Sequence, residues 1–186
     1  MSASIFLDTN EPSGTSALPN NDIPALTQSL QLYLSAKGVE VLTIRNQSLN
    51  IATPSQTAAI ANSKQVALYL SICSCSLCPC STCGCVEALV YRHGNRAAAI
   101  AHQLTNKISS LGLYNLGIRE CPNHTILRRT NMPAIRLCIA LPSVNPSPRV
   151  HSCLHRNIAS LIGQELIPFL ESSIGFSSDS SKQFFP

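Results

Sequence analysis

Residues 66–91 constrain the fold more than any other stretch of the chain. They begin with the apolar run VALYLSI, residues 66–72, whose length and composition are typical of a buried strand in a parallel sheet. A cysteine-containing loop follows, and residues 86–91, VEALVY, form a second strand-like run. The loop therefore leaves the C-terminal end of one predicted strand, which is the end at which open α/β sheets usually bind ligands.

Predicted helices and strands alternate along the rest of the chain. Apolar stripes with helical spacing, or a Thr-Pro or Ser-Pro start, predict helices over residues 22–36, 54–63, 95–110 and 148–171. Short apolar runs predict strands over residues 4–8, 39–44, 66–72, 86–91 and 134–140, with a loop over 111–123 and a short strand over 124–127. This order predicts an α/β fold, with a mostly parallel central sheet of about five to six strands and helices on both faces.

The predicted fold occupies one domain, residues 1–172, and residues 173–186 are expected to form a Ser-rich flexible tail. The runs at 66–72 and 134–140 are apolar without interruption. We therefore expect these two strands at the centre of the sheet, adjacent or nearly adjacent to each other.

Composition excludes several classes of partner. Charged residues make up 12% of the chain, about half of the usual ~25%, and the net charge of +4 comes without a long Lys/Arg run. A nucleic-acid partner is therefore not predicted. No apolar run reaches the ~18 residues of a membrane span, and the first residues lack the pattern of a signal peptide. The default expectation is a cytoplasmic protein without a membrane span.

Cysteines are the most distinctive residues of the chain. The total of nine is odd, which excludes a complete set of intramolecular disulfides, and reduced thiols are the default without an export signal. Six of them recur with a five-residue period: Cys73, Cys75, Cys78, Cys80, Cys83 and Cys85. The two cysteines of a C-x-C pair in an extended segment lie on one side, so three pairs suit zinc, copper(I) or an iron–sulfur cluster. The alternative is a flexible Ser/Cys/Pro loop without metal.

Several blocks of the sequence, taken in order, resemble the zinc-dependent N-acetylmuramoyl-L-alanine amidases, which cut bacterial cell walls. These blocks are residues 5–8, 34–45, 56–62, 70–72, 84–87 and 127–135. The last block, LRRTNMPAI, is the most specific, because it is close to the family's Leu-Arg-x-Thr-x-x-Pro-Ala-Val pattern. The likeness runs from about residue 4 to about residue 170. It implies an amidase-like α/β fold, with zinc as the family's cofactor and peptidoglycan as its substrate.

The positions that carry the family's chemistry differ in this chain. The family binds zinc through a His after the first strand, a Glu before the first helix and the His of a Ser-Ile-His strand end. These positions align with Glu11, with Asn20 or less well Asp22, and with Cys73. The family's catalytic Glu aligns with Cys138. An amide is a poor zinc ligand and a thiol does not simply replace a carboxylate base, so amidase turnover is not expected.

The resemblance nevertheless places three potential ligands around the family's zinc pocket: Glu11, Cys73 and Cys138. A carboxylate and two thiolates are acceptable ligands for zinc, so a changed metal site is one interpretation. The other is an inactive pocket filled by small polarisable side chains. Arg128, Arg129 and Arg136 are expected near the predicted cleft, and Arg128 is the candidate for binding an anionic peptide or glycan group, although a solvated pair of arginines is the favoured alternative.

His151 and His155 stand four residues apart on a predicted helix, a spacing that binds zinc when a third ligand joins. A solvated helix face is the alternative for this pair.

Three functional hypotheses remain from the sequence. The first is hydrolysis of the amide bond between muramic acid and L-alanine. The second, which the replaced ligands favour, is a non-catalytic domain that binds a peptidoglycan fragment or a protein partner. The third, which the cysteine period favours, is a thiolate metal-binding or redox protein that uses the loop of residues 73–85.

Overall fold

The computed structural model describes residues 3–9, 22–44, 53–75, 78, 84–142 and 148–177, without the side chains of residues 22, 148–152 and 174–177. Within these ranges no helix is long and apolar enough to cross a membrane.

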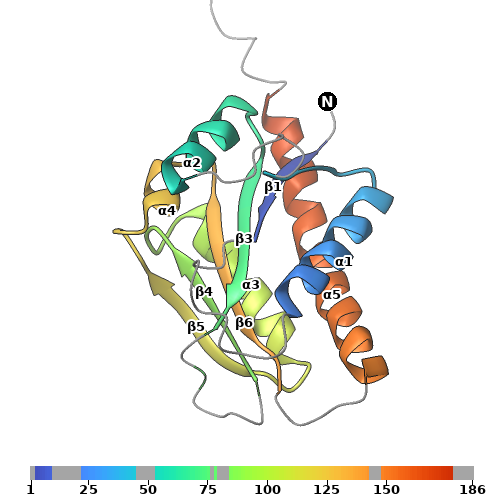
Figure 1. Ribbon diagram of the computed structural model, residues 1–186. Coiled ribbons are helices and arrows are strands. Elements are labelled where there is room, and N and C mark those ends of the chain that lie inside the picture. The colour runs from blue at the N-terminus through green and yellow to red at the C-terminus, as the bar shows by residue number, and fades with distance from the viewer. Residues whose placement is uncertain are drawn as a thin grey trace, which may run out of the picture.

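Six strands form one sheet in the order β2-β1-β3-β6-β4-β5 (Figure 1). Their bounds are β1 Ser4–Asp8, β2 Glu40–Leu42, β3 Leu68–Ser74, β4 Cys85–Val90, β5 Tyr114–Glu120 and β6 Ala134–Ala140. Strands β2, β1, β3 and β6 run parallel to one another, whereas β4 pairs with β6 antiparallel and with β5 in parallel. The predicted α/β class and the mostly parallel sheet are confirmed. The two most apolar strands, β3 and β6, are central neighbours, as expected.

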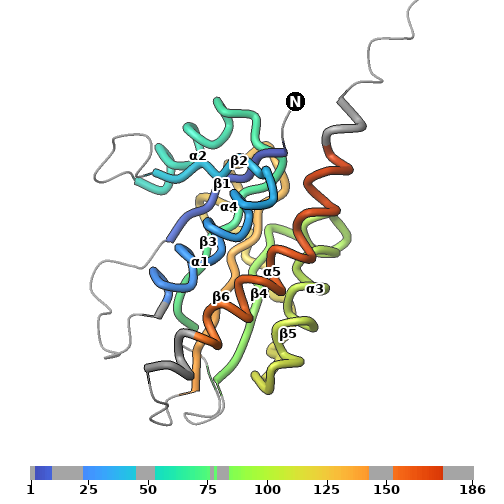
Figure 2. Tube along the Cα trace, turned by 90° about the vertical axis from the view of Figure 1, so that its right-hand side faces the viewer, coloured from blue at the N-terminus to red at the C-terminus, as the bar shows by residue number. Residues whose placement is uncertain are grey.

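Helices cover both faces of the sheet. Their bounds are α1 Asp22–Ala36, α2 Pro54–Ser63, α3 Arg96–Ser109, α4 Thr125–Arg129 and α5 Pro148–Ser177. One face of the sheet shares a hydrophobic core with α1, α3 and α5, and the other shares a smaller core with α2 and α4. Figure 2 shows this division, with α3 and α5 on one side of the strands and α2 on the other.

Alternation along each strand decides which side chain enters which core. In β3, Leu68, Leu70 and Ile72 face α1 and α5, whereas Tyr69 and Cys73 face α2 and α4. The core on the α1, α3 and α5 side is almost wholly aliphatic. The core on the α2 and α4 side contains four of the buried cysteines, namely Cys73, Cys75, Cys85 and Cys138.

Local signals placed most helices correctly. Helix α1 begins and ends where its apolar stripe predicts. Helix α2 begins after Thr53, whose side chain accepts a hydrogen bond from the Gln56 backbone N–H while the Gln56 side chain accepts one from the Thr53 N–H. Asn95 caps α3 in the same way through the backbone N–H of Ala98.

Three expectations were wrong. Residues 111–123 are not a loop, because β5 pairs with β4 at the sheet edge, where its mostly exposed polar side chains are tolerated. Residues 124–127 are not a strand, because Thr125–Arg129 forms the short helix α4, which buries Ile126 and Leu127. Helix α5 continues past residue 171 to Ser177. The tail expected over residues 173–186 lies mostly outside the described residues and stays a prediction.

Candidate functional site

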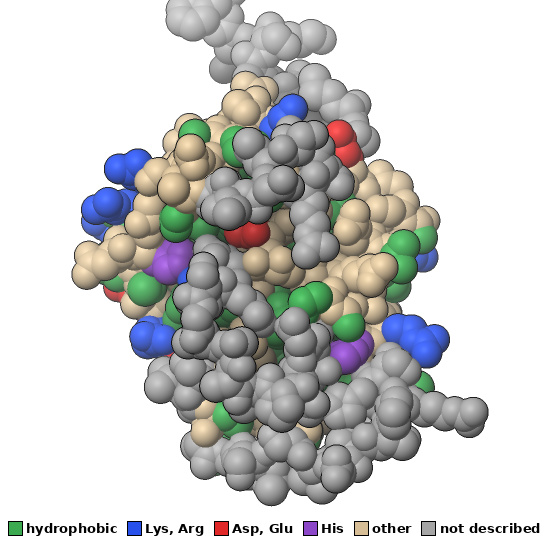
Figure 3. All heavy atoms as spheres, in the orientation of Figure 1, with side chains coloured by type: hydrophobic (Ala, Val, Ile, Leu, Met, Phe, Trp, Pro, Cys, Tyr) green, Lys and Arg blue, Asp and Glu red, His purple; other side chains and the backbone are tan. Residues whose placement is uncertain are grey.

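Polar and thiol side chains gather on the face of the sheet that α2 and α4 cover. They come from alternate positions of β3, β6 and β4: Tyr69, Ser71, Cys73, Arg136, Cys138, Cys85 and Glu87. Figure 3 views this face and shows Lys and Arg side chains mainly at its margins. Most of these polar and thiol side chains are buried, and Arg136 is half-buried.

Cys73 and Cys138 lie directly opposite each other on the parallel strands β3 and β6. Their sulfur atoms are 3.0 Å apart, and the Cys73 sulfur is also 3.7 Å from the carbonyl oxygen of Leu137. Cys73 is 1% exposed and Cys138 is 7% exposed. Neither is part of a disulfide.

Arg136 connects this thiol pair to His124. The Arg136 Nε–H donates to the Cys73 sulfur over 3.1 Å, and Arg136 Nη1 lies 2.7 Å from His124 Nε2. A guanidinium has no acceptor, so His124 Nε2 must accept, and its ring is neutral in this arrangement. Burial of His124 and the nearby charge of Arg136 both lower the pKa of that imidazole, which is consistent with a neutral ring.

The two thiols of the pair differ in acidity. The hydrogen bond from Cys138 lowers the pKa of Cys73 to about 7, with help from the charge of Arg136 and against the effect of burial. The pKa of Cys138 is raised by its hydrogen bond to Cys73 and by burial. Cys73 is therefore the more acidic thiol of the pair and loses its proton before Cys138 does.

Three further thiols meet where the cysteine loop enters β4. Cys85 is hydrogen-bonded to Cys75 and Cys78, and burial together with these bonds raises its pKa. Cys75 and Cys85 are buried and Cys78 is half-buried. Of the other predicted metal ligands, Cys80, Cys83 and Glu11 lie outside the described residues, as does Asn20.

Within the described part of the chain, no group of three His, Cys, Asp or Glu side chains is arranged to hold a metal ion. The described residues by themselves therefore do not form the zinc site that the amidase resemblance implies.

Asp8 and Tyr69 form a second buried polar contact on the same face. The Tyr69 hydroxyl donates to Asp8 Oδ2 over 2.6 Å, and the Tyr69 ring stacks on Phe6. Burial raises the pKa of Asp8 despite this hydrogen bond, and burial with the Asp8 charge raises the pKa of Tyr69. A cavity of about 490 Å³ reaches Asp8 between β1, α1 and β2. Its polar lining includes Thr9, Thr27, Gln28, Gln31 and Thr43.

Glu87 is the buried carboxylate nearest to Cys138, which it opposes in the antiparallel register of β4 and β6. Its two oxygens accept hydrogen bonds from Arg119 at 2.7 and 3.2 Å. The same pairing raises the pKa of Arg119. Glu87 is thus held in a bidentate ion pair, in which the Arg119 guanidinium occupies both of its oxygens.

The remaining candidates lie apart from the thiol pair. Arg128 is exposed in the last turn of α4. His155 is buried on α5, on the opposite side of the sheet, so the expectation of a solvated face was wrong for this residue, because its part of α5 packs inward. The side chain of His151 lies outside the described residues.

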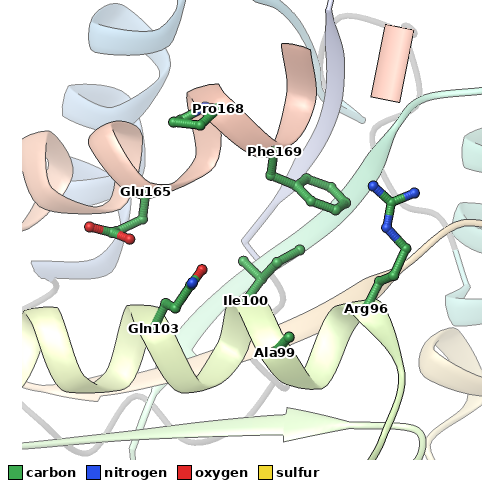
Figure 4. A pocket seen from close by; sticks show the side chains of 7 residues that line it. All are labelled: Arg96, Ala99, Ile100, Gln103, Glu165, Pro168 and Phe169. Atoms are coloured by element: carbon green, nitrogen blue, oxygen red, sulfur yellow. The ribbon is translucent and has the colours of Figure 1, made fainter. Parts of the chain in front are cut away.

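A second cavity, of about 410 Å³, lies on the far side of the sheet between α3 and α5 (Figure 4). The Arg96 guanidinium stands over the Phe169 ring there, 4.9 Å from its centre. Glu165, which also lines this cavity, pairs with Lys107 at 3.6 Å. This cavity lies on the opposite side of the sheet from the thiols. Substitutions of its residues therefore serve as controls for substitutions near the thiols.

Sequence reasoning missed the contact that links His124, Arg136 and Cys73. A usable signal was present, because residues 134–140, AIRLCIA, form a strand in which alternate residues share a face. That parity puts Arg136 beside Cys138. The position of His124 was not predictable, since residues 124–127 were expected to be a strand.

Comparisons with known proteins give matches among solved structures alone, because no protein-family model and no curated protein matches the chain. The N-acetylmuramoyl-L-alanine amidase from Clostridium difficile 630 is 24% identical, with a TM-score of 0.69 over 92% of this chain and 98% of that one. The catalytic domain of CwlV, an N-acetylmuramoyl-L-alanine amidase from Bacillus (Paenibacillus) polymyxa var. colistinus, is 19% identical, with a TM-score of 0.72 over 92% and 99%. The CwlD amidase from Clostridioides difficile, solved in complex with the GerS lipoprotein, is 14% identical, with a TM-score of 0.69 over 91% and 99%. The chain therefore has the fold of the N-acetylmuramoyl-L-alanine amidases.

Proposed function

We propose that this chain is an amidase-like domain that binds a peptidoglycan fragment without cleaving it. The observation that carries the proposal is the state of Cys73, which stands where the amidase resemblance expects a zinc-binding His. Its sulfur is engaged by Cys138 and by the guanidinium of Arg136 at 3.1 Å. A cation held that close to the sulfur repels a second cation, so the arrangement disfavours zinc at this position.

Hydrolysis also needs a base, and neither Cys138 nor Glu87 is placed to act as one. The resemblance places Cys138 at the position of the family's catalytic Glu, and burial together with its bond to Cys73 raises the pKa of that thiol. Glu87, the nearest buried carboxylate, is occupied by Arg119. A thiol that keeps its proton and a carboxylate in a bidentate ion pair do not activate water.

Two arginine side chains on the same face are available to bind an anionic ligand. Arg136 is half-buried beside the thiol pair, and Arg128 is exposed on the adjacent helix α4. Guanidinium groups bind carboxylates in bidentate fashion, so an anionic peptide or glycan group fits this surface. A protein is the other candidate ligand, and CwlD, which has this fold, is solved bound to GerS.

Cosedimentation with purified peptidoglycan tests the proposal, together with an assay for released stem peptides. We expect binding without release, even with added zinc. Arg128→Gln should weaken binding, whereas Arg96→Gln, on the far side of the sheet, should not. Zinc-dependent release that a chelator abolishes would show that the domain is an active amidase. Failure of the wild-type protein to cosediment would exclude peptidoglycan and leave a protein partner.

A second candidate function is thiolate metal binding or redox chemistry in the loop of residues 73–85, with zinc among the possible metals. The contacts of Cys85 with Cys75 and Cys78 support it, since they bring thiols of the loop together, although these three alone are not arranged to hold a metal ion. Metal analysis of reduced protein purified without oxygen tests this function. Cys75→Ser with Cys78→Ser should then reduce uptake, whereas Cys153→Ser on α5 should not. Absence of zinc, copper(I) and iron uptake by the wild-type protein would exclude it.

A further inference from the structure

We propose that Cys73 and Cys138 form a reversible dithiol–disulfide couple that a small hydroperoxide oxidises. This activity goes beyond fragment binding and does not depend on it.

The backbone already satisfies the geometry of a disulfide. Cys73 and Cys138 are register partners on neighbouring parallel strands, and their side chains share one face. Neighbouring strands lie about 4.8 Å apart, which falls inside the range of about 4.4–6.8 Å that disulfides require between Cα atoms. The sulfur atoms are 3.0 Å apart and must approach to about 2.05 Å to bond. A side-chain rotation of that size leaves the pairing of β3 and β6 intact.

The sulfur–sulfur spacing alone does not separate a disulfide from a shared zinc ion. Two thiolates on one tetrahedral zinc, each about 2.3 Å from the metal, stand about 3.8 Å apart. Cys73 and Cys138 are closer than that, at 3.0 Å. The sulfurs would approach by about 1.0 Å to bond and separate by about 0.8 Å to share zinc, so the two changes are similar in size. The Arg136 cation beside the Cys73 sulfur favours oxidation over binding of a second cation.

Arg136 lies beside both sulfurs, and its Nε contact favours Cys73 as the one that reacts first. Its Nε–H donates to the Cys73 sulfur, and a cationic donor stabilises a thiolate. The Cys73 thiolate attacks one oxygen of the hydroperoxide and breaks the O–O bond, giving a sulfenic acid and an oxyanion that takes up a proton. The Cys138 sulfur then attacks the Cys73 sulfur, and its proton leaves with the departing hydroxide as water. For hydrogen peroxide, two thiols lose two electrons in total and two waters form.

Burial limits the oxidant to a small molecule. Cys73 is 1% exposed and Cys138 is 7% exposed, so a protein thiol or disulfide does not reach them as easily as a peroxide does. The competing pairing is Cys85 with Cys75 or Cys78, which are also in contact. These thiols lack the contact with Arg136, and burial raises the pKa of Cys85. We therefore expect the Cys73–Cys138 bond to form first.

Mass spectrometry of the wild-type protein tests this order directly. Reduced protein is treated with one equivalent of hydrogen peroxide, blocked with an alkylating reagent and digested. We expect the peptide that joins Cys73 to Cys138 to be the most abundant disulfide product, and dithiothreitol should restore both thiols. A product dominated by Cys75–Cys85 or Cys78–Cys85, or a pair that stays reduced, would overturn the proposal.

Substitutions then test the assigned roles. Cys138→Ser should trap a sulfenic acid on Cys73 that a cyclic 1,3-dione labels, whereas Cys73→Ser should leave Cys138 unlabelled. Cys153→Ser should form the disulfide at the wild-type rate. Arg136→Gln should slow oxidation severalfold, and Arg136→Lys should restore part of the rate, because the charge returns without the Nε contact. An unchanged rate in Arg136→Gln would refute the positioning role of Arg136. Circular dichroism of each variant shows whether the fold is retained.

Discussion

Gly84→Ala is the substitution for which the structure makes the sharpest prediction of stability. Gly84 joins the cysteine loop to β4 with φ +68°, a left-handed conformation that costs a residue with a side chain about 1–2 kcal/mol. A Cβ at this position would also lie 2.5 Å from the carbonyl oxygen of Ala140 and 2.9 Å from Cδ of Pro142. The obstacle is backbone and a proline ring, which do not move aside as a flexible side chain does.

The two effects add to a measurable loss. Overpacking of this kind costs about 1–3 kcal/mol, so Gly84→Ala should destabilise the domain by about 3 kcal/mol in total. Each kcal/mol shifts the Tm of a domain of this size by about 2–4 °C, which gives a decrease of about 6–12 °C. The matched control is Gly112→Ala, where φ is +90° but no atom lies within 4 Å of the added Cβ. The control should lose only about 1 kcal/mol, or about 2–4 °C.

Thermal and urea unfolding of both variants measure this difference. The clash also has a local consequence, because Ala140 is two residues from Cys138 on β6. Displacement of that strand end should lower the yield of the Cys73–Cys138 disulfide in Gly84→Ala but not in Gly112→Ala. Equal losses of stability in the two variants would show that β4 does not approach the end of β6 as closely as described.

Two further substitutions test the buried carboxyl and a helix cap. Burial raises the pKa of Asp8, so the folded state binds its proton more tightly, and stability should fall as pH rises from the unfolded pKa through the folded one. Asp8→Asn keeps an acceptor for the Tyr69 hydroxyl, so urea unfolding between pH 4 and 7 should show higher stability at pH 7 and a flatter pH profile than wild type. Thr53→Ala removes the acceptor for the Gln56 N–H and should cost about 1 kcal/mol, whereas Thr53→Ser should cost less, as the same unfolding measurements would show.

The fold was predictable where the sequence pattern of a segment agrees with the place that the segment takes in the folded sheet. Residues 134–140 are apolar enough for a central strand, and the Thr53 cap with Pro54 marks the start of α2 in the sequence itself. Strand β5 was missed because YNLGIRE has neither an apolar run nor a regular alternation, and it becomes a strand only through pairing with β4. The register of that pair shifts between Val86 and Ala88, a feature of the folded sheet that sequence spacing does not reveal.

The candidate site was predictable in part. The amidase resemblance put Cys73 and Cys138 near one pocket, and the structure brings their sulfurs to 3.0 Å. The contact of Cys73 with Arg136, and of Arg136 with His124, depends in part on α4, because His124 directly precedes this helix. Helix α4 has five residues, too few for a periodic pattern to predict it. Sequence signals are weak for such short helices, because their burial comes from the tertiary fold.

Arg136 connects the two proposed activities, and this connection has a testable consequence. In the reduced protein its guanidinium donates to the Cys73 sulfur, the more acidic member of the pair. A disulfide carries no charge, so oxidation leaves a half-buried cation without its anionic acceptor and frees it for a carboxylate of the ligand. The coupling free energy between two sites is typically about 1–3 kcal/mol. We expect the lower end of this range, which means that the oxidised protein binds the ligand about fivefold more tightly, because Arg136 is only half-buried.

Cosedimentation of peroxide-oxidised and reduced protein with peptidoglycan measures this coupling. Arg136→Gln should abolish the difference between the two states, whereas Arg96→Gln should preserve it. Linkage is reciprocal, so a bound fragment should also make the Cys73–Cys138 disulfide easier to form. Equal affinities of the oxidised and reduced wild-type protein would mean that Arg136 keeps its place beside the sulfur in both states and that binding relies on other groups, such as Arg128.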